Sequence, residues 1–386
     1  MSTTLIRLAA LLVVWTVFSS AIAWAFIGPL ALLNSQRAEA ASNGKAAAPG
    51  ESSDVRIIVL DDSDSDYKNP PFADTVYLRN SKGEAIKTLS GFNICQTVGG
   101  CRAVSASDDG ASFVVCENVA NKLSAYETGT GKQIWSLPGG FTTAVMSGPW
   151  TYALTSAGTI YGDNLLAIDG TGTITNQAKV GGCDIAVDPA HRVLWLVGAD
   201  IKKCDLNLQV LMTVDPIAWC AVSVDVSADG SIWVAEREHP DVQGSTNRLL
   251  NISPDGALLQ TIPLANMTPL RVRVDRSSGR VWVTGLVLGK ALVWRHPFRW
   301  PPLWVTEGKR LGTRTHQYSV QGELLVKIKH GGESLDLDRS DGSVWIAGES
   351  KLLHYSRGGK RLGTCGGVSA GDKWITIVPQ GRKSDR

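Results

Sequence analysis

Residues 333–367 have the sequence ESLDLDRSDGSVWIAGESKLLHYSRGGKRLGTCGG. An alternating run at 334–338 is followed by a Ser-Asp-Gly turn, and a second run carries Trp345. A third run at 352–356 is joined through a Gly-Gly turn to a fourth at 361–364. Short alternating runs separated by glycine turns are typical of β-hairpins. The stretch therefore predicts four short antiparallel strands.

The aromatic position of the second predicted strand recurs along the chain. It is occupied by Trp345, Trp282, Trp233, Trp195 and Phe113, with a weaker copy around Trp150 and Tyr152. Glycine pairs follow the same cycle, at Gly99-Gly100, Gly139-Gly140, Gly181-Gly182, Gly331-Gly332 and Gly366-Gly367. Stacked repeats need a large apolar residue at one phase, because each unit buries its face against the next. A period of about 35 to 60 residues with four strands per unit predicts an all-β fold, a β-propeller.

Two segments resemble the repeat unit of a known class of propellers. Residues 229–235 are DGSIWVA and residues 247–256 are NRLLNISPDG. Both are similar to the repeats of NHL and streptogramin-lyase-like propellers. The resemblance extends over roughly residues 100–379, strongly in three units and weakly in the others. It implies the fold and leaves the activity open, since one fold serves many functions.

The two ends of the chain predict one shared blade. The run VRIIVL and residues 74–89 supply strands near the N-terminus, and 373–378 is a lone strand near the C-terminus. Joined together they give six whole blades and a composite one, seven in all. Six is the alternative if the weak unit at 141–182 or the N-terminal piece is not a blade. The propeller is expected over residues 55–379, followed by a polar tail at 380–386.

Residues 1–34 predict a signal anchor or a signal peptide. No charged residue lies between Arg7 and Arg37, and the apolar run at 8–33 is long enough to span a bilayer. This run exceeds the usual signal-peptide core, which favours a retained transmembrane helix, whereas the A-I-A and A-E-A sequences offer cleavage contexts. Small polar residues at 35–54 predict a flexible linker. The propeller is therefore expected outside the cytoplasm, periplasmic or extracellular and membrane-anchored, or secreted if the signal is cleaved.

Charge and cysteine content narrow the function classes. The formal charge is +2, from 38 basic and 36 acidic side chains, so the sequence predicts no nucleic-acid partner. None of the seven cysteines forms a C-x-x-C pair or a zinc-like spacing with histidine, so no metal site is predicted from them. Cys95 and Cys101 flank a glycine pair and are expected to form a local disulfide.

A long insertion between two strands of the penultimate unit predicts a binding surface. It spans about residues 287–313. Between Lys290 and His316 the sequence has six Lys/Arg and only one acid, Glu307. Aromatic and arginine side chains anchor many interfaces. We expect a docking loop for a protein or glycan partner that is acidic or accepts aromatic rings, anionic lipid headgroups included; a lid over its own blade is the alternative. The predicted binding residues are Trp294, Arg295, Phe298, Arg299, Trp300 and Trp304.

A shorter insertion carries the only candidates for catalysis. Streptogramin lyases are metal-assisted enzymes with a histidine and glutamates at the channel mouth. Glu236, Glu238 and His239 are the nearest counterparts that this resemblance implies, and all three lie in one insertion. Inner-strand starts carry mixed charge, which argues against a cup for a divalent metal; these residues are Asp184, Glu333, Arg102 and Arg271.

These observations favour a non-catalytic function. The hypothesis is an exported, membrane-tethered propeller that acts as a binding or scaffold module through its channel-mouth face, with no cofactor. The alternative is an extracytoplasmic lyase or lactonase-like enzyme that uses the channel mouth with a divalent metal.

Overall fold

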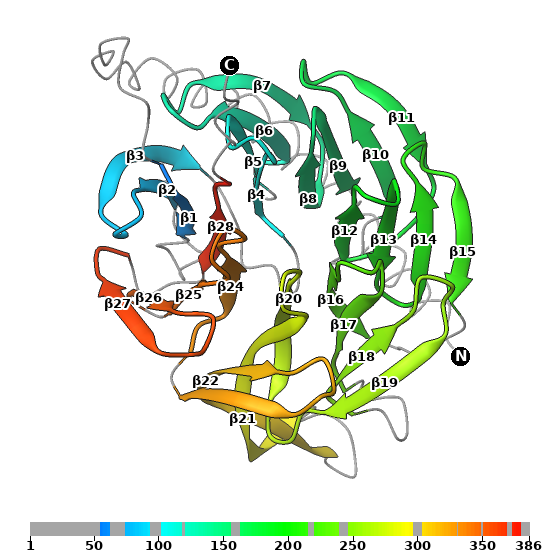
Figure 1. The fold of residues 1–386 in the computed structure, drawn as a ribbon, viewed down its shortest axis with the longest axis vertical. Coiled ribbons are helices and arrows are strands. Elements are labelled where there is room, and N and C mark those ends of the chain that lie inside the picture. The colour runs from blue at the N-terminus through cyan, green and yellow to red at the C-terminus, as the bar shows by residue number, and fades with distance from the viewer. Residues whose placement is uncertain are drawn as a thin grey trace, which may run out of the picture. The chain divides into compact units, whose positions relative to one another are not determined.

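The computed structural model of the protein shows a seven-bladed β-propeller (Figure 1). It describes residues 55–61, 74–92, 102–117, 120–155, 163–214, 220–238, 246–295, 303–329, 331–348, 350–368 and 373–379, with 288–295 and 303–310 described by their backbone. These residues form 28 strands and no helix, within a compact unit, Ser52–Arg386. No helix in this part of the chain could cross a membrane. The predicted signal segment at 1–34 and the linker at 35–54 lie outside the described residues, as does the tail at 380–386.

Each blade is a four-stranded antiparallel sheet whose first strand lines the centre of the ring (Figure 1). The innermost strands are β28 (Lys373–Ile377), β4 (Val104–Ala106), β8 (Phe141–Ser147), β12 (Asp184–Asp188), β16 (Ala221–Val226), β20 (Thr268–Asp275) and β24 (Ser334–Leu337). The second strands are β1 (Ile57–Asp61), β5 (Ser112–Glu117), β9 (Trp150–Thr155), β13 (Val193–Val197), β17 (Ile232–Glu236), β21 (Arg280–Arg295) and β25 (Val344–Ala347). The third strands are β2 (Asp74–Arg79), β6 (Lys122–Glu127), β10 (Asn164–Ile168), β14 (Ile201–Asp205), β18 (Arg248–Ile252), β22 (Leu303–Tyr318) and β26 (Leu352–Tyr355). The outer strands are β3 (Ala85–Phe92), β7 (Gln133–Pro138), β11 (Ile174–Ala178), β15 (Val210–Val214), β19 (Leu258–Pro263), β23 (Leu324–Lys329) and β27 (Arg361–Cys365). We number the blades 1 to 7 in this order, so that blade 1 contains β28, β1, β2 and β3.

Blade 1 is the composite blade that the sequence predicts. The C-terminal β28 pairs antiparallel with β1, with Ile57 opposite Ile377 and Asp61 opposite Lys373. The weak unit at 141–182 is a complete blade formed by β8 to β11. Seven blades are therefore correct, and the six-bladed alternative is wrong.

The repeated aromatic residue packs between blades, as predicted. Each of these side chains is no more than 3 % exposed, and each lies on the second strand of its blade. They are Phe113, Tyr152, Trp195, Trp233, Trp282 and Trp345. In blade 3 the buried position belongs to Tyr152, while Trp150 is half-buried. Truncation of such a side chain to alanine costs about 3–5 kcal/mol, so this single phase accounts for much of the stability of the ring.

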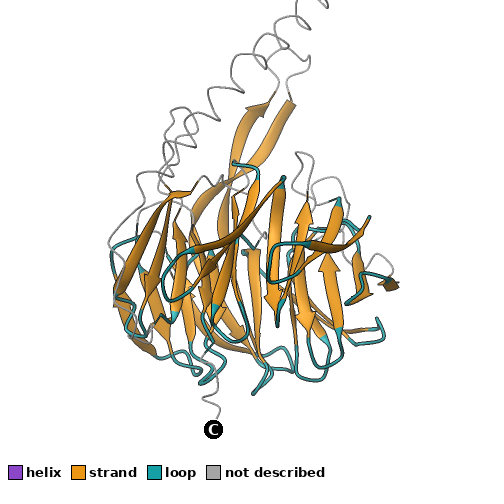
Figure 2. Cartoon of the chain, turned by 90° about the horizontal axis from the view of Figure 1, so that it is seen from above, coloured by secondary structure: helices purple, strands orange, loops and turns teal. Residues whose placement is uncertain are grey.

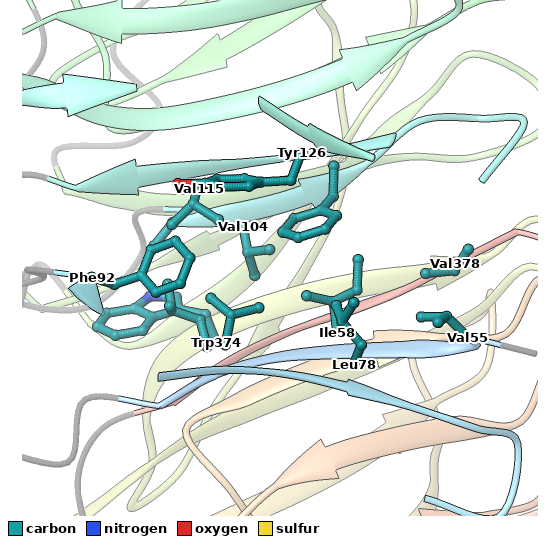
Figure 3. Close-up of a cluster of buried hydrophobic side chains, with 13 residues drawn as sticks. Val55, Ile58, Leu78, Phe92, Val104, Val115, Tyr126, Trp374 and Val378 are labelled. Carbon is teal, nitrogen blue, oxygen red and sulfur yellow. The ribbon is translucent and has the colours of Figure 1, made fainter. Parts of the chain in front are cut away.

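The core consists of separate clusters at the seams between blades, because each inner strand is covered on both faces. In β1 the side chains alternate between two seams: Ile58 packs with Phe113 of blade 2, and Ile57 packs with Trp345 of blade 7. Figure 3 shows the first seam, which also contains Trp374 and Tyr126. The period of two in a β-strand therefore connects each blade to both of its neighbours.

Side chains of the preceding blade accept hydrogen bonds from backbone N–H groups at the inner edges of the blades. An innermost strand has a free edge, and its buried backbone N–H groups need acceptors. Serine and aspartate side chains supply them across four of the seven junctions. The pairs, donor first, are Met146 to Ser105, Val224 to Asp184, Val274 to Asp225 and Ile377 to Asp336, at 2.8 to 3.1 Å. These aspartates therefore hold adjacent blades together at the channel.

The largest departure from the regular blade is in blade 6. Strands β21 and β22 contain 16 residues each, whereas the other strands contain at most eight. Strand β20 pairs with β21 up to Leu286, and β23 pairs with β22 from Arg314 onward. Beyond these points β21 and β22 pair only with each other, and Figure 2 shows a two-stranded ribbon rising past the ends of the other strands.

Candidate functional site

The predicted docking loop is largely a β-ribbon, which corrects the sequence interpretation. Trp294 and Arg295 end β21, and Trp304 is the second residue of β22. Trp294 and Trp304 are register partners, as are Arg295 and Leu303. The remaining predicted binding residues, Phe298, Arg299 and Trp300, lie outside the described residues. The sequence does not distinguish a loop from a ribbon here, because Pro297, Pro301 and Pro302 interrupt the pattern between two runs that pair as strands.

The ribbon lies at the same end of the propeller as the shorter insertion. Both insertions join a second strand to a third, and in a propeller these connections share one face with the crossings between blades. The structure therefore places the two predicted regions on one face. We refer to residues 287–295 of β21 and 303–312 of β22, which pair only with each other, as the β21/β22 ribbon.

Glu236 and Glu238, the two candidate catalytic residues that the structure describes, differ in burial and in their contacts. Glu236 is fully buried and forms an ion pair with Arg248 of the adjacent strand. Glu238 is exposed, and its backbone N–H donates to the Asn247 side chain at 3.1 Å. His239 lies outside the described residues. The structure thus gives Glu236 a strand-to-strand contact, and a glutamate held in this way is less available as a metal ligand.

Charged side chains from several blades meet in the central channel. Arg102, which precedes β4, forms an ion pair with Asp184 of β12, with Nε and Oδ1 3.7 Å apart. Arg273 of β20 donates from Nε to Asp336 of β24 at 3.1 Å. The first pair joins blades 2 and 4, which are not adjacent, so these two side chains extend toward the centre of the ring; the second pair joins the adjacent blades 6 and 7. Of the mixed charges predicted at the inner-strand starts, Arg102 and Asp184 are therefore paired with each other.

The channel charges influence one another's ionisation. Burial alone would lower the pKa of Arg273, but Asp336, Asp225 and Asp184 raise it above its usual value. Burial would raise the pKa of Asp225, but Arg273 and nearby arginines, together with the Val274 N–H, lower it. Both groups therefore stay charged at neutral pH, because opposite charges outweigh the desolvation cost.

Arg276, which follows β20, contacts the backbone of two other blades. Its guanidinium donates from Nε to the carbonyl of Val226 at 3.0 Å and from Nη2 to the carbonyl of Val187 at 3.2 Å. It therefore bridges blades 6, 5 and 4. Burial and the nearby Arg339 lower the pKa of Arg276.

The described residues contain no group of three or more His, Cys, Asp or Glu side chains that could hold a metal ion. Cys95 and Cys101, the predicted disulfide, lie outside them. Of the cysteines that are described, Cys204, Cys220 and Cys365 are free thiols.

Sequence reasoning missed the central members of the channel cluster. Asp225, Arg273 and Asp336 each lie opposite the repeated tryptophan of the neighbouring strand, pairing in register with Trp233, Trp282 and Trp345. The sequence does carry a signal, because a charged residue eight or nine positions before a buried tryptophan recurs in three consecutive blades. This signal lies at the position opposite the aromatic residue and not at the starts of the inner strands.

Comparisons with known proteins show the fold alone. No family model and no curated protein matches the chain. Among solved structures, a functionally unknown protein from Desulfotomaculum acetoxidans DSM 771 is similar with a TM-score of 0.59 at 13% identity, over 84% of this chain and 99% of that one. Kuenenia stuttgartiensis hydrazine synthase is similar with a TM-score of 0.52 at 12% identity, over 70% and 80%.

BamB from Moraxella catarrhalis matches with a TM-score of 0.45 at 12% identity, over 77% of this chain and 83% of that one. The predicted resemblance to NHL and streptogramin-lyase-like propellers holds at the level of the β-propeller fold, which the seven four-stranded sheets show.

Proposed function

We propose that this chain is an exported, membrane-tethered propeller that acts as a non-catalytic binding module, and that the end carrying the β21/β22 ribbon contacts the partner. The observation that carries this proposal is the ribbon itself. Its strands pair only with each other beyond Leu286 and Thr313. A two-stranded ribbon is marginally stable in water and has two free edges. Such an element is best explained by a partner that packs on it or pairs with it.

Charge indicates the kind of partner. Six Lys/Arg and one acid lie between Lys290 and His316, in a chain of nearly balanced charge. An acidic protein or glycan surface complements this excess. Anionic lipid headgroups share that chemistry, and a tether at residues 8–33 would keep them nearby.

The channel gives less support to the enzyme alternative. A metal-assisted lyase or lactonase needs carboxylates and imidazoles that converge on one point. Asp184, Asp225 and Asp336 instead accept hydrogen bonds from the backbone of the next blade. Bound divalent metal, or an activity lost with a chelator, would favour the enzyme over the binding module.

A shortened ribbon tests the proposal. Leu288 and Arg310 are register partners, so replacing residues 289–309 with Asn-Gly joins them through a tight turn and keeps the blade intact. Chemical cross-linking in intact cells, followed by mass spectrometry, should recover one partner with the full chain and lose it with the shortened chain. Equal recovery from both would show that the ribbon is not the binding element.

Localisation needs its own measurement. Once the layers outside the anchoring membrane have been removed, protease added to the intact cells should digest the propeller. Without protease, the protein should remain in the membrane fraction. Protection of the propeller until the cells are lysed would contradict export.

A further inference from the structure

Arg102 presents a pair of donors in the channel that has no acceptor among the described residues. Its Nε and Nη2 atoms are both buried and make no hydrogen bond. These two N–H groups lie on one side of the guanidinium and match two oxygens of a carboxylate or phosphate. A buried charged donor left without an acceptor is costly. The pair of donors, which we call the Arg102 fork, is therefore suited to an anionic ligand.

The surroundings of Arg102 place this fork within the channel. Arg102 belongs to blade 2, yet the charges that act on it come from blades 4 to 7. Burial and Arg273 lower its pKa, whereas Asp184, Asp225 and Asp336 raise it. A guanidinium confined to the seam of its own blade would not interact with four blades around the ring.

The backbone holds Arg102 in place. Its N–H donates to the Thr143 hydroxyl at 2.8 Å, and its carbonyl accepts from the Ala144 N–H at 3.1 Å. Both contacts are to β8 of the next blade. They fix the backbone from which the side chain with the fork extends.

Nearby carboxylates are already used by the fold. Oδ2 of Asp184 accepts from the Ser223 hydroxyl at 2.9 Å and from the Val224 N–H at 3.1 Å. Its Oδ1 accepts from the Ile185 N–H at 3.0 Å and lies 3.7 Å from Nε of Arg102, beyond hydrogen-bond reach. Asp184 thus reduces the net positive charge around Arg102 without filling the fork.

We propose that the Arg102 fork binds a small oxyanion, two of whose oxygens accept from Nε and Nη2. Inorganic phosphate and a small carboxylate share this chemistry. The negative charges of Asp184, Asp225 and Asp336 oppose the anion and Arg273 offsets them in part, so the binding is expected to be salt-sensitive. This site is separate from the β21/β22 ribbon, and either proposal can fail without the other.

Calorimetric titration of the full-length chain in detergent tests the site, with sodium phosphate and sodium acetate at constant ionic strength set by chloride. Saturable binding with one ion per chain is expected. Arg102→Lys keeps the charge but removes the fork, and should weaken binding about tenfold or more, since it loses at least one charge-assisted hydrogen bond. Arg361→Lys, at an exposed position on β27, is the matched control and should bind like the parent.

The two arms identify the ion: binding of phosphate alone assigns a tetrahedral oxyanion, and binding of acetate alone assigns a carboxylate. Equal binding by the parent and by Arg102→Lys, or no saturable binding of either ion, would overturn the proposal. If Arg102→Lys does not fold, a crystal of the parent soaked in selenate decides the matter. Anomalous density at the fork supports the site, and its absence, together with no saturable binding of acetate by the parent, rejects it.

Discussion

The carboxylate of Asp336 accepts a hydrogen bond from the backbone N–H of Ile377 at 2.8 Å, which joins the last complete blade to the C-terminal strand. The other oxygen of this carboxylate accepts from Nε of Arg273 at 3.1 Å. One side chain thus connects blades 6, 7 and 1. Arg79 of β2 reinforces the closure, because its guanidinium donates to the carbonyls of Gly366 and Gly367.

Removal of residues 367–386 should therefore destabilise the whole propeller. The deletion removes β28 and three of its buried apolar side chains, Trp374, Ile375 and Ile377. At about 1.5–3 kcal/mol each, their loss alone is roughly 5 kcal/mol or more, comparable to the total stability of many domains. Thermal unfolding followed by circular dichroism is the measurement.

Deletion of residues 380–386 is the matched control for this truncation, since it removes a polar tail and leaves β28 intact. This shorter deletion should unfold like the parent. If the longer deletion also kept the parent's melting temperature, the ring would not depend on the C-terminal strand.

Stability should depend on pH through His316. Burial, together with Lys327 and Arg314, lowers the pKa of His316 to about 4, from an unfolded value of about 6.5. Because the folded pKa is depressed, the unfolded state binds the proton more readily. Stability should therefore be full above pH 6.5 and fall as the pH drops from about 6.5 to about 4, by at most about 3 kcal/mol.

Urea unfolding at a series of pH values measures this dependence. His316→Gln keeps a polar side chain near the Tyr318 hydroxyl, the partner of His316 at 3.2 Å, but does not titrate. Its stability should vary less across this window. A slope equal to that of the parent would assign the pH dependence to other groups.

Substitution of Glu236 should affect stability. Its side chain is fully buried against Arg248, and breaking a buried ion pair leaves a charge without its partner. Glu236→Gln should lower the free energy of unfolding by about 1–3 kcal/mol, whereas Glu238→Gln, at an exposed position, should leave it unchanged. Chemical denaturation of both variants tests this. Parent-like stability of Glu236→Gln, together with loss of a divalent ion, would revive the enzyme alternative.

The fold could be predicted from the sequence because its main determinant is local and repeated. Six of the seven blades place one aromatic residue on the second strand, so the period, the glycine turns and the two complementary ends were sufficient to predict seven blades. Trp282 and Trp345, for example, have the same phase, and both are buried. A signal repeated in six units can be recognised even when one copy, at Tyr152, is weak.

The channel cluster could not be predicted in the same way. Arg102 and Arg273 lie in different blades, and only closure of the ring brings them near Asp184. Likewise, residues 287–295 of β21 and 303–312 of β22 pair only with each other. Burial therefore imposes no alternating pattern on their sequence that would distinguish a ribbon from a loop.

The segment between β21 and β22 provides the last prediction. Replacing Arg299 and Trp300 with alanine should leave the free energy of unfolding within about 1 kcal/mol of the parent, because the docking-surface prediction puts both side chains at the surface. Partner binding should fall roughly 30-fold or more, because interface arginine and tryptophan residues often contribute about 2 kcal/mol or more each. The matched control is Arg361→Ala with Leu362→Ala, an exposed pair on the outer strand of blade 7. Cross-linking yield and melting temperature are measured on all three proteins. A large fall in melting temperature for the ribbon variant would show that its tip packs on the propeller as a lid, and unchanged cross-linking would place the partner elsewhere.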